Sequence, residues 1–351
     1  MAVRIGVIGA GTVSKHHMEA YAKLKDVKVE VVCDLNEARA RKAASTYSIP
    51  RAVMNHQQLL NEKLDAVSIC TWNNTHADLT IDCLKAGVNV ICEKPPAMNT
   101  AQAVEMLNAS KKSGKLLMIG FTKRFTSKLI AVKRLVDDGV LGNIYSARAA
   151  FLRRAGNPGG WFADIKRSGG GPLIDLGVHN IDQARFLMGK PKAKTISAVT
   201  FAKLGLRGNI TEPARWLSAD FDPKTPSTVE DQTTAFIRFD NGAALSVDVS
   251  YSQHRDTDEQ TYLDLYGDKA GVSLEPKLVI SSENNDYLTD TFPWVAEDVY
   301  QKPFDREISH FVDCVRDGAV CLNPAEDGVE IMKILDGIYE SARLSREVQI
   351  S

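Results

Sequence analysis

Three side chains in two separate segments have the types that oxidation of an alcohol requires. Lys94 follows an apolar run that ends in Glu93, and Asp175 and His179 stand four positions apart in a later segment. Removing a hydride and a proton from one carbinol carbon requires a group that accepts the proton and a cation that favours the developing alkoxide. An imidazole titrates near neutral pH and suits reversible proton transfer, and an aspartate can orient that imidazole or bind the hydroxyl directly. These residues indicate dehydrogenase chemistry.

Each of these elements is weak evidence when taken alone. A lysine before a proline usually lies in a solvated loop, and an Asp/His pair at helical spacing more often forms a surface hydrogen bond. Lys94, however, stands at the end of a predicted parallel strand, where open α/β sheets bind ligands. Asp175 and His179 share one face of a predicted helix over 173–188. The joint occurrence of the two elements favours a catalytic site.

A glycine motif near the N-terminus predicts a dinucleotide site. Gly9 and Gly11 lie directly after a strand-like run, and the motif continues through Thr12 and Val13 into a predicted helix. The first glycine permits a tight turn, and the second lets the backbone approach a pyrophosphate at the helix N-terminus. Glycines after a strand often only form turns, so this motif needs further support.

Asp34 supplies that support because it ends the second predicted strand, where the dinucleotide fingerprint places an acid for the ribose hydroxyls. A carboxylate at this position repels the extra phosphate of NADP, so NAD is favoured. Arg39 and Arg41 follow closely and keep NADP as the less favoured alternative.

The elements around these motifs predict two domains. Residues 1–122 alternate strands and helices, which is typical of βαβ units and a parallel sheet. The predicted strands are 3–8, 27–33, 64–71, 88–92 and 116–119, and the helices between them are 14–24, 37–47, 77–86 and 100–113. We expect an NAD-binding Rossmann domain over 1–122, in which His16 and His17 are helix-surface or packing residues.

Residues 123–351 predict a different architecture, an α+β domain with a large, mostly antiparallel open sheet. The predicted strands are 144–154, 195–201, 233–239, 243–251, 261–266 and 278–281, and further helices are 127–138, 305–317 and 325–345. Asn241-Gly242 between two strands predicts a hairpin with a type I′ turn. We expect this domain to bind substrate and to form the contacts of an oligomer.

The chain resembles the glucose–fructose oxidoreductase and inositol dehydrogenase superfamily over essentially its whole length. The resemblance rests on the glycine motif, on Thr71–His76 followed by Glu93-Lys94-Pro95, and on Gly169–Asp182. The resemblance implies that Lys94 polarises the reacting hydroxyl, that His179 is the acid/base and that Asp175 acts with them. It also implies that the cofactor is lined by Thr71, Asn73, His76 and Glu93. Trp72 stands where a proline is common. A homodimer or homotetramer is expected on the same ground.

The substrate pocket is expected to include side chains from a glycine-rich stretch, because an indole face stacks on a sugar ring and charged groups bind its hydroxyls. Trp161 and Lys123 are the main candidates, and both have a solvated-surface alternative. Further candidates in the stretch are Arg153, Arg154, Asn157 and Asp164.

Composition excludes several other classes of protein. A net charge of −1 provides no field for nucleic acid, and no apolar stretch approaches the roughly 18 residues of a membrane span. The six cysteines form no Cys-x-x-Cys pair and are expected not to cluster with histidines, so we expect no metal site, no disulfides and a cytoplasmic location.

The leading hypothesis is therefore an NAD-dependent dehydrogenase that acts on a ring hydroxyl of an inositol, monosaccharide or glycoside. One alternative is an NAD-dependent glycosidase that oxidises a ring carbon transiently and then eliminates the aglycone. Another is a non-catalytic dinucleotide-sensing regulator, which would have no need of Lys94, Asp175 and His179.

Overall fold

The computed structural model describes residues 2–210 and 216–350, and the chain divides into two compact units. The first unit comprises Met1–Thr126 and Asp298–Val329, and the second comprises Ser127–Glu297 and Glu330–Ser351. The sequence predicts one second domain over 123–351, whereas the structure places 298–329 with the first unit. The reason is helix α9 (Lys302–Asp317), whose buried face joins the hydrophobic core of the first unit.

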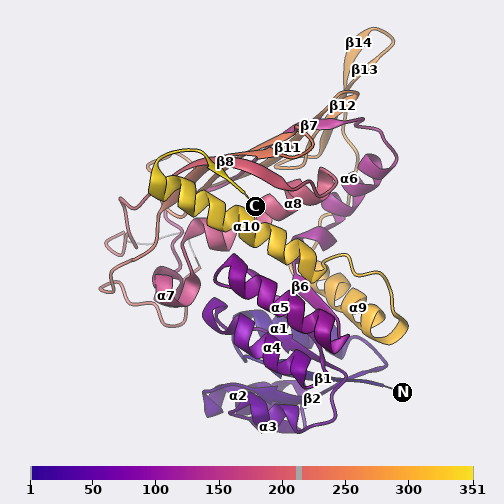
Figure 1. Ribbon diagram of the computed structural model, residues 1–351, viewed down its shortest axis with the longest axis vertical. Coiled ribbons are helices and arrows are strands. Elements are labelled where there is room, and N and C mark those ends of the chain that lie inside the picture. Colours follow the sequence, from indigo (N-terminus) through magenta and orange to yellow (C-terminus); the bar gives the residue numbers. More distant parts are fainter. Residues whose placement is uncertain (1, 211–215, 351) are drawn as a thin grey trace. The chain divides into compact units, whose positions relative to one another are not determined.

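The first unit contains the expected parallel sheet. Its six strands run in the order β3-β2-β1-β4-β5-β6 and pair in parallel throughout. This is the doubly wound Rossmann order, which reverses between β1 and β4. The strands are β1 Val3–Ile8, β2 Val27–Cys33, β3 Arg51–Val53, β4 Ala66–Ile69, β5 Asn89–Glu93 and β6 Leu117–Gly120. The helices are α1 Thr12–Ala22, α2 Glu37–Tyr47, α3 His56–Leu60, α4 His76–Lys85 and α5 Thr100–Ser113, with short 3₁₀ turns η1 Asn73–Thr75 and η2 Thr122–Phe125 (Figure 1).

The second unit contains a nine-stranded sheet in the order β14-β13-β12-β11-β7-β10-β9-β8-β15. Its described neighbours pair antiparallel except β7 with β10, which are parallel. The strands are β7 Ile144–Arg153, β8 Ala193–Phe201, β9 Gln232–Phe239, β10 Ala244–Ser250, β11 Glu259–Gly267, β12 Ala270–Ser273, β13 Val279–Asn284, β14 Tyr287–Thr291 and β15 Val348–Gln349. The helices are α6 Ser127–Asp137, α7 Ile165–Ser168, a π-helical turn Leu173–Gly177, α8 Val178–Leu187 and α10 Ala325–Leu344, whose first residues belong to the first unit.

The large sheet has one buried face and one exposed face. Along β9, Ala235, Ile237 and Phe239 are buried, whereas Thr234 and Phe236 between them are exposed. Such alternation with period two places every second side chain in the core. The half-buried strand pattern expected from the sequence is therefore present.

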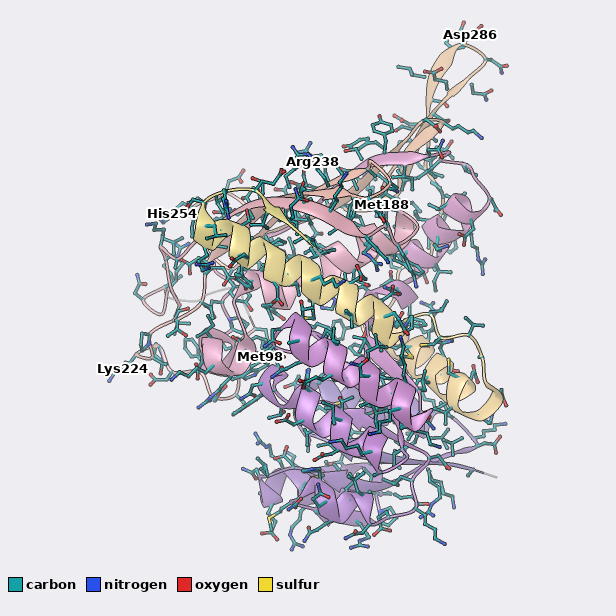
Figure 2. All side chains as sticks on the ribbon, viewed as in Figure 1. Met98, Met188, Lys224, Arg238, His254 and Asp286 are labelled. Carbon is teal, nitrogen blue, oxygen red and sulfur yellow. The ribbon has the colours of Figure 1, made fainter. Side chains whose placement is uncertain are left out.

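Two hairpins of this sheet show how the turn residues act. Between β9 and β10 the N–H of Gly242 donates to Phe239 O (3.2 Å), and in this turn only Gly242 has a positive φ, 86°. The predicted hairpin is confirmed, but the predicted type I′ turn is wrong, because the chain forms a type I turn followed by a glycine bulge. A type I′ geometry occurs instead between β13 and β14, where Asn285 and Asp286 have φ of 51° and 65° (Asp286 is labelled in Figure 2).

Among the described residues, no helix combines the length and the apolar character that crossing a membrane requires.

Candidate active site

The turn after β1 is shaped by Gly9. This residue has φ of 94°, and a Cβ atom built on it would lie 2.4 Å from the carbonyl oxygen of Cys70 at the end of β4. Only glycine fits a backbone that approaches its neighbour so closely in this conformation. The turn therefore brings the start of α1 to the carboxyl edge of the sheet, where such sheets bind ligands.

The N-terminus of α1 fits a pyrophosphate. Gly11 is its N-cap residue, and this position has no side-chain cap hydrogen bond. A Cβ atom at Gly11 would meet no described atom within 4 Å, so packing does not require glycine here. The absence of a side chain instead leaves the helix N-terminus open to a ligand. Thr12 and Val13 supply the first amides of the helix, and the helix dipole favours an anion there. This cradle is what a dinucleotide phosphate requires.

Asp34 lies at the end of β2 beside this turn. Its Oδ2 accepts the N–H of Ala10 (2.9 Å), and its Oδ1 accepts from the guanidinium of Arg39 (3.1 Å). Arg41 pairs with Glu37 one helical turn earlier (2.6 Å). Both arginines that could attract the extra phosphate of NADP are thus paired with carboxylates, which supports the preference for NAD.

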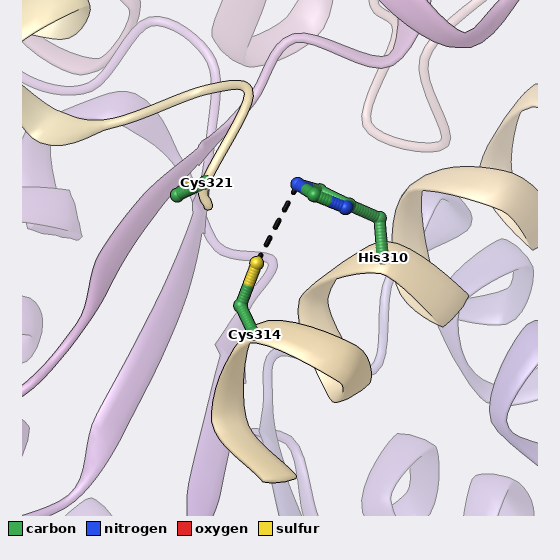
Figure 3. Close-up of side chains that lie close together, drawn as sticks. All are labelled: His310, Cys314 and Cys321. Carbon is green, nitrogen blue, oxygen red and sulfur yellow. Dashed lines mark hydrogen bonds between the residues drawn. The ribbon is translucent and has the colours of Figure 1, made fainter. Parts of the chain in front are cut away.

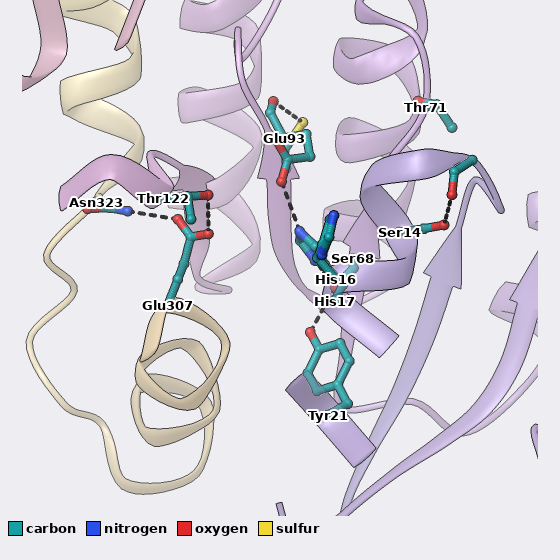
Figure 4. Close-up of polar contacts among 12 residues, drawn as sticks. Ser14, His16, His17, Tyr21, Ser68, Thr71, Glu93, Thr122, Glu307 and Asn323 are labelled. Carbon is teal, nitrogen blue, oxygen red and sulfur yellow. Dashed lines mark hydrogen bonds and ion pairs between the residues drawn. The ribbon is translucent and has the colours of Figure 1, made fainter. Parts of the chain in front are cut away.

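A buried polar network extends from α1 to the end of β5 (Figure 4). Nε2 of His17 donates to Oε1 of Glu93 (2.8 Å), and Nδ1 of His17 lies 3.2 Å from Oγ of Ser68. The hydroxyl of Tyr21 lies 2.8 Å from the same Oγ. His17 was expected to be a surface or packing residue, and the structure adds that this fully buried ring fixes the Glu93 carboxylate next to Lys94. His16 packs on Phe304, with ring centroids 4.7 Å apart.

His76 joins the loops that follow β4 and β5. Its Nδ1 lies 2.8 Å from the carbonyl oxygen of Pro95, and its Nε2 lies 3.2 Å from that of Thr71. Burial lowers the pKa of His76, although both carbonyls act in the opposite direction. The imidazole therefore connects the Thr71 loop to the Glu93-Lys94-Pro95 segment. Asn73 is buried on the first of these loops, and Lys94 is half-buried on the second.

Asp175 and His179 lie on consecutive turns of one helical segment in the second unit. The sequence predicted a continuous α-helix, but Leu173–Gly177 forms a π-helical turn before α8 begins at Val178. π-Helical turns are rare and occur frequently at functional sites. Both residues lie on this one segment, and the wider π-helical turn changes the angle between them from that of the expected α-helix.

Tyr251 holds Asp175, and sequence reasoning missed it. Its side chain is fully buried, and its hydroxyl donates to Oδ2 of Asp175 (3.0 Å). Burial and the neighbouring carboxylate both raise the pKa of Tyr251, so the hydroxyl remains a donor in alkaline solution. The carbonyl of Tyr251 also accepts the N–H of Gly156 (2.6 Å). Tyr251 therefore connects Asp175 to the glycine-rich stretch that contains Trp161. No sequence motif marks this tyrosine, because the contact joins residues far apart in the chain.

Glu230 anchors the glycine-rich turn before Asp175. Its two carboxylate oxygens accept the N–H groups of Gly171 (2.9 Å) and Leu173 (3.2 Å), and the hydroxyl of Tyr339 donates to Oε1 (3.0 Å). A Cβ atom at Gly171 would lie 2.3 Å from the carbonyl oxygen of Glu230, so the close approach requires glycine. Burial raises the pKa of Glu230, although these hydrogen bonds lower it in part. No sequence motif marks Glu230.

The glycine-rich stretch places an aromatic cluster at the surface of the second unit. The rings of Trp161 and Phe162 lie 3.9 Å apart, and Trp216 contacts Phe162 edge to face at 5.6 Å. Trp216, which no sequence pattern indicates, is 52% exposed. Such a platform suits the C–H face of a sugar ring.

Three of the four further candidates in this stretch have structural partners. Arg153 donates to Glu259 (2.9 Å), and Asp164 caps α7 by accepting the N–H of Lys166 (3.0 Å). Asn157 is fully buried and accepts the N–H of Gly159 (2.9 Å).

The predicted residues are therefore divided between the units. Lys94 and the cofactor candidates belong to the first unit, as does Lys123, which is exposed on η2. Trp161, Asp175 and His179 belong to the second unit.

One expectation about cysteines is wrong. Cys314 does lie close to a histidine: its Sγ is 3.5 Å from Nε2 of His310, one helical turn earlier on α9. The spacing of four residues on a predicted helix was the signal that would have revealed this contact.

The fold and the site define a class of protein, a two-domain oxidoreductase that binds NAD on a Rossmann fold. Residues 3–121 match an oxidoreductase family with an NAD-binding Rossmann fold, and residues 129–273 match the GFO/IDH/MocA C-terminal domain. The chain belongs to this family, as the sequence predicted.

Similar proteins include several sugar and cyclitol dehydrogenases. The D-glucoside 3-dehydrogenase of Escherichia coli strain K12 is 34% identical over 99% of this chain and 97% of that protein. The myo-inositol 2-dehydrogenase of Thermotoga maritima is 26% identical over 99% of this chain and 98% of that protein. Among solved structures, a levoglucosan dehydrogenase in complex with NADH shares the fold, with a TM-score of 0.86 at 24% identity and full coverage of both chains.

Proposed function

We propose that this protein oxidises a secondary hydroxyl on the ring of a sugar, glycoside or cyclitol, with NAD as the hydride acceptor. The observation that carries the proposal is the Asp175 carboxylate, held by the buried Tyr251 hydroxyl at 3.0 Å on a π-helical turn. A fixed carboxylate one turn before an imidazole supplies what deprotonation of an alcohol needs. When bound, NAD supplies the hydride acceptor that the protein itself lacks.

The residues have separate roles in this proposal. His179 accepts the hydroxyl proton, and Asp175 hydrogen-bonds the substrate hydroxyl or orients the imidazole. Lys94 stabilises the developing alkoxide by its positive charge. Gly9, Gly11, Thr12 and Val13 receive the pyrophosphate. Asp34 is assigned to the ribose hydroxyls of NAD.

Glycosides are the first substrates to test. The D-glucoside 3-dehydrogenase supports this choice, because its identity of 34% exceeds the 26% of the myo-inositol 2-dehydrogenase. The aromatic cluster of Trp161, Phe162 and Trp216 supports a ring substrate in general.

The test is NADH formation at mildly alkaline pH across glucosides, free aldoses, sugar phosphates and inositols, with NADP in parallel. Turnover of one such compound with NAD is the expected result. Cleavage of a glycoside without accumulation of NADH would instead identify an NAD-dependent glycosidase. Binding of NAD with no chemistry on any compound would favour a sensor and contradict the proposal.

Replacement of the proposed reacting groups tests the mechanism. Lys94→Ala and His179→Ala are each expected to lower kcat by at least about a hundredfold, because each removes a group that acts in the transition state. The dissociation constant of NAD, measured by calorimetry, is expected to remain near that of the wild type. Wild-type kcat in both variants would contradict the assigned roles.

We also propose that the exposed face of the nine-stranded sheet packs against a second copy of the chain. Val199, Phe201 and Phe236 are 46%, 44% and 38% exposed on β8 and β9. Apolar residues gathered on one open face are typical of an interface. A homodimer or homotetramer would bury them.

A further inference from the structure

The end of α9 and the loop after it carry three side chains that are typical metal ligands. His310 and Cys314 lie one turn apart on α9, and Gly318, with φ of 69°, ends the helix so that the loop brings back Cys321. A ring nitrogen of His310 and the two Sγ atoms all lie within 4.8 Å of one another, and the three residues are shown in Figure 3. The proposed function does not use these residues.

The spacing agrees with tetrahedral coordination. Zinc–sulfur bonds of about 2.3 Å and zinc–nitrogen bonds of about 2.0 Å place neighbouring tetrahedral donors roughly 3.5 to 3.8 Å apart. The distance from Nε2 of His310 to Sγ of Cys314 is 3.5 Å. The remaining donor pairs need to close by at most about 1.3 Å, and Cys321 lies on the loop after α9 and not on the helix itself.

We propose that His310, Cys314 and Cys321 form a binding site for a thiophilic divalent cation of the Zn²⁺ type, with water as the fourth ligand. Thiolate and imidazole ligands select such cations over Mg²⁺ and Ca²⁺, which prefer oxygen. Binding converts both thiols to thiolates and releases two protons to solvent, so charge and atoms balance.

The groups around His310, Cys314 and Cys321 are compatible with a bound cation. Nε2 of His310 accepts the N–H of Leu322 (3.0 Å), so this nitrogen carries a lone pair and not a proton. The cation replaces that amide, which lies at an exposed position and can bind water. The nearby guanidinium of Arg124 is paired with Asp327 (2.8 Å), which offsets its charge. Cys314 is buried, whereas His310 and Cys321 are partly exposed, which leaves a path for a hydrated ion.

Binding fastens the loop between α9 and α10 to helix α9. The loop already contacts β6 and η2, because Asn323 O accepts the N–H of Ile119 (2.9 Å) and Leu322 O accepts from Arg124 (2.5 Å). Within the same unit, the Glu307 carboxylate on α9 accepts from the hydroxyl of Thr122 (2.6 Å; Figure 4). A cation at the three ligands adds a cross-link from α9 to this loop.

The first test uses the unmodified full-length protein, reduced and freed of metal. It is alkylated with N-ethylmaleimide in the presence and absence of Zn²⁺, and each modified cysteine is identified by mass spectrometry. We expect Zn²⁺ to slow alkylation of Cys321 and Cys314 by about tenfold or more, with no change at Cys70. Protection that persists after the metal is chelated would reveal a disulfide and overturn the proposal.

The second test measures coordination directly. One equivalent of Co²⁺ is expected to give a thiolate charge-transfer band and tetrahedral visible bands in the wild type. Cys321→Ser is expected to lose the charge-transfer intensity, whereas Cys83→Ala, which removes a buried thiol on α4, is expected to retain it. Circular dichroism establishes that both variants fold. Equal spectra in the two variants, or no band in the wild type, would overturn the proposal.

Discussion

At the scale of single residues, the carboxylate of Asp175 depends on one buried donor. Tyr251 has no exposed surface, and the raised pKa of its hydroxyl keeps the proton in place at the alkaline pH of the assay. A hydrogen bond to a charged group contributes about 1.5 to 3 kcal/mol. The orientation of Asp175 should therefore be sensitive to loss of this one oxygen atom.

Tyr251→Phe removes the donor and keeps the ring. We expect kcat/KM for the sugar substrate to fall about ten- to a hundredfold, because the carboxylate loses a charged hydrogen bond. NAD binding, measured by calorimetry, should not change. Tyr145→Phe is the control, since that tyrosine is 59% exposed on β7. A kcat/KM within twofold of the wild type would show that Tyr251 does not position Asp175.

We expect Asp34 to control the choice of cofactor through its charge. Asp34→Asn keeps an acceptor for the N–H of Ala10 and removes the negative charge that pairs with Arg39. The released guanidinium can then bind the extra phosphate of NADP. We expect the ratio of kcat/KM for NAD to that for NADP to fall about tenfold or more, equivalent to about 1.4 kcal/mol. Glu37→Gln, which releases Arg41 on the same helix, is the control, and an equal shift in both variants would argue against a specific role for Asp34.

At the scale of elements, the π-helical turn depends on an anchor outside itself. Glu230 precedes β9, yet its carboxylate binds two amides at the start of the segment that carries Asp175. Its raised pKa has a defined consequence for stability. The native state holds the proton more tightly than the unfolded chain, so the wild type loses stability as pH rises from the ordinary range of a glutamate through the raised pKa.

Glu230→Gln removes this titration and replaces one acceptor with a donor. We expect the free energy of unfolding to fall by about 1 to 3 kcal/mol, because an amide at the turn loses its partner. The advantage of the wild type over the variant should be larger near about pH 5 than near about pH 8. Urea unfolding at the two pH values measures this difference, with Glu283→Gln on the exposed side of β13 as the control. A difference that does not vary with pH, or that increases as pH rises, would contradict the direction of the pKa shift.

At the scale of the whole molecule, the open sheet face determines the proposed assembly. Val199→Lys places a charge on β8 at a position that is 46% exposed. If a second copy covers this face, burial of the charge should weaken self-association by about tenfold or more. Sedimentation velocity at several concentrations measures the change, and Val104→Lys on α5 of the first unit is the control. A monomeric wild type, or equal association of the wild type and Val199→Lys, would exclude this interface.

The sequence by itself determined the features that depend on neighbours along the chain. Hydrophobic periodicity predicted the parallel and antiparallel sheets, since strands and helices bury their side chains at different intervals. Gly9, Gly11 and Asp34 indicated the cofactor site, because the turn and the helix N-terminus that bind a dinucleotide are local. The motifs around Lys94 and Asp175 indicated the family for the same reason.

Only the tertiary structure decided the features that join distant segments. Tyr251 contacts Asp175 and Glu230 holds Gly171 across long stretches of chain, and neither contact leaves a periodic or spaced signal. Helix α9 joins the core of the first unit although it follows the second unit's strands, because its buried face fits there. The π-helical turn stands where an α-helix is expected, and Glu230 binds an amide at its start from outside the segment. Contacts of this kind form between segments that only the folded chain brings together, so no pattern of neighbouring residues predicts them.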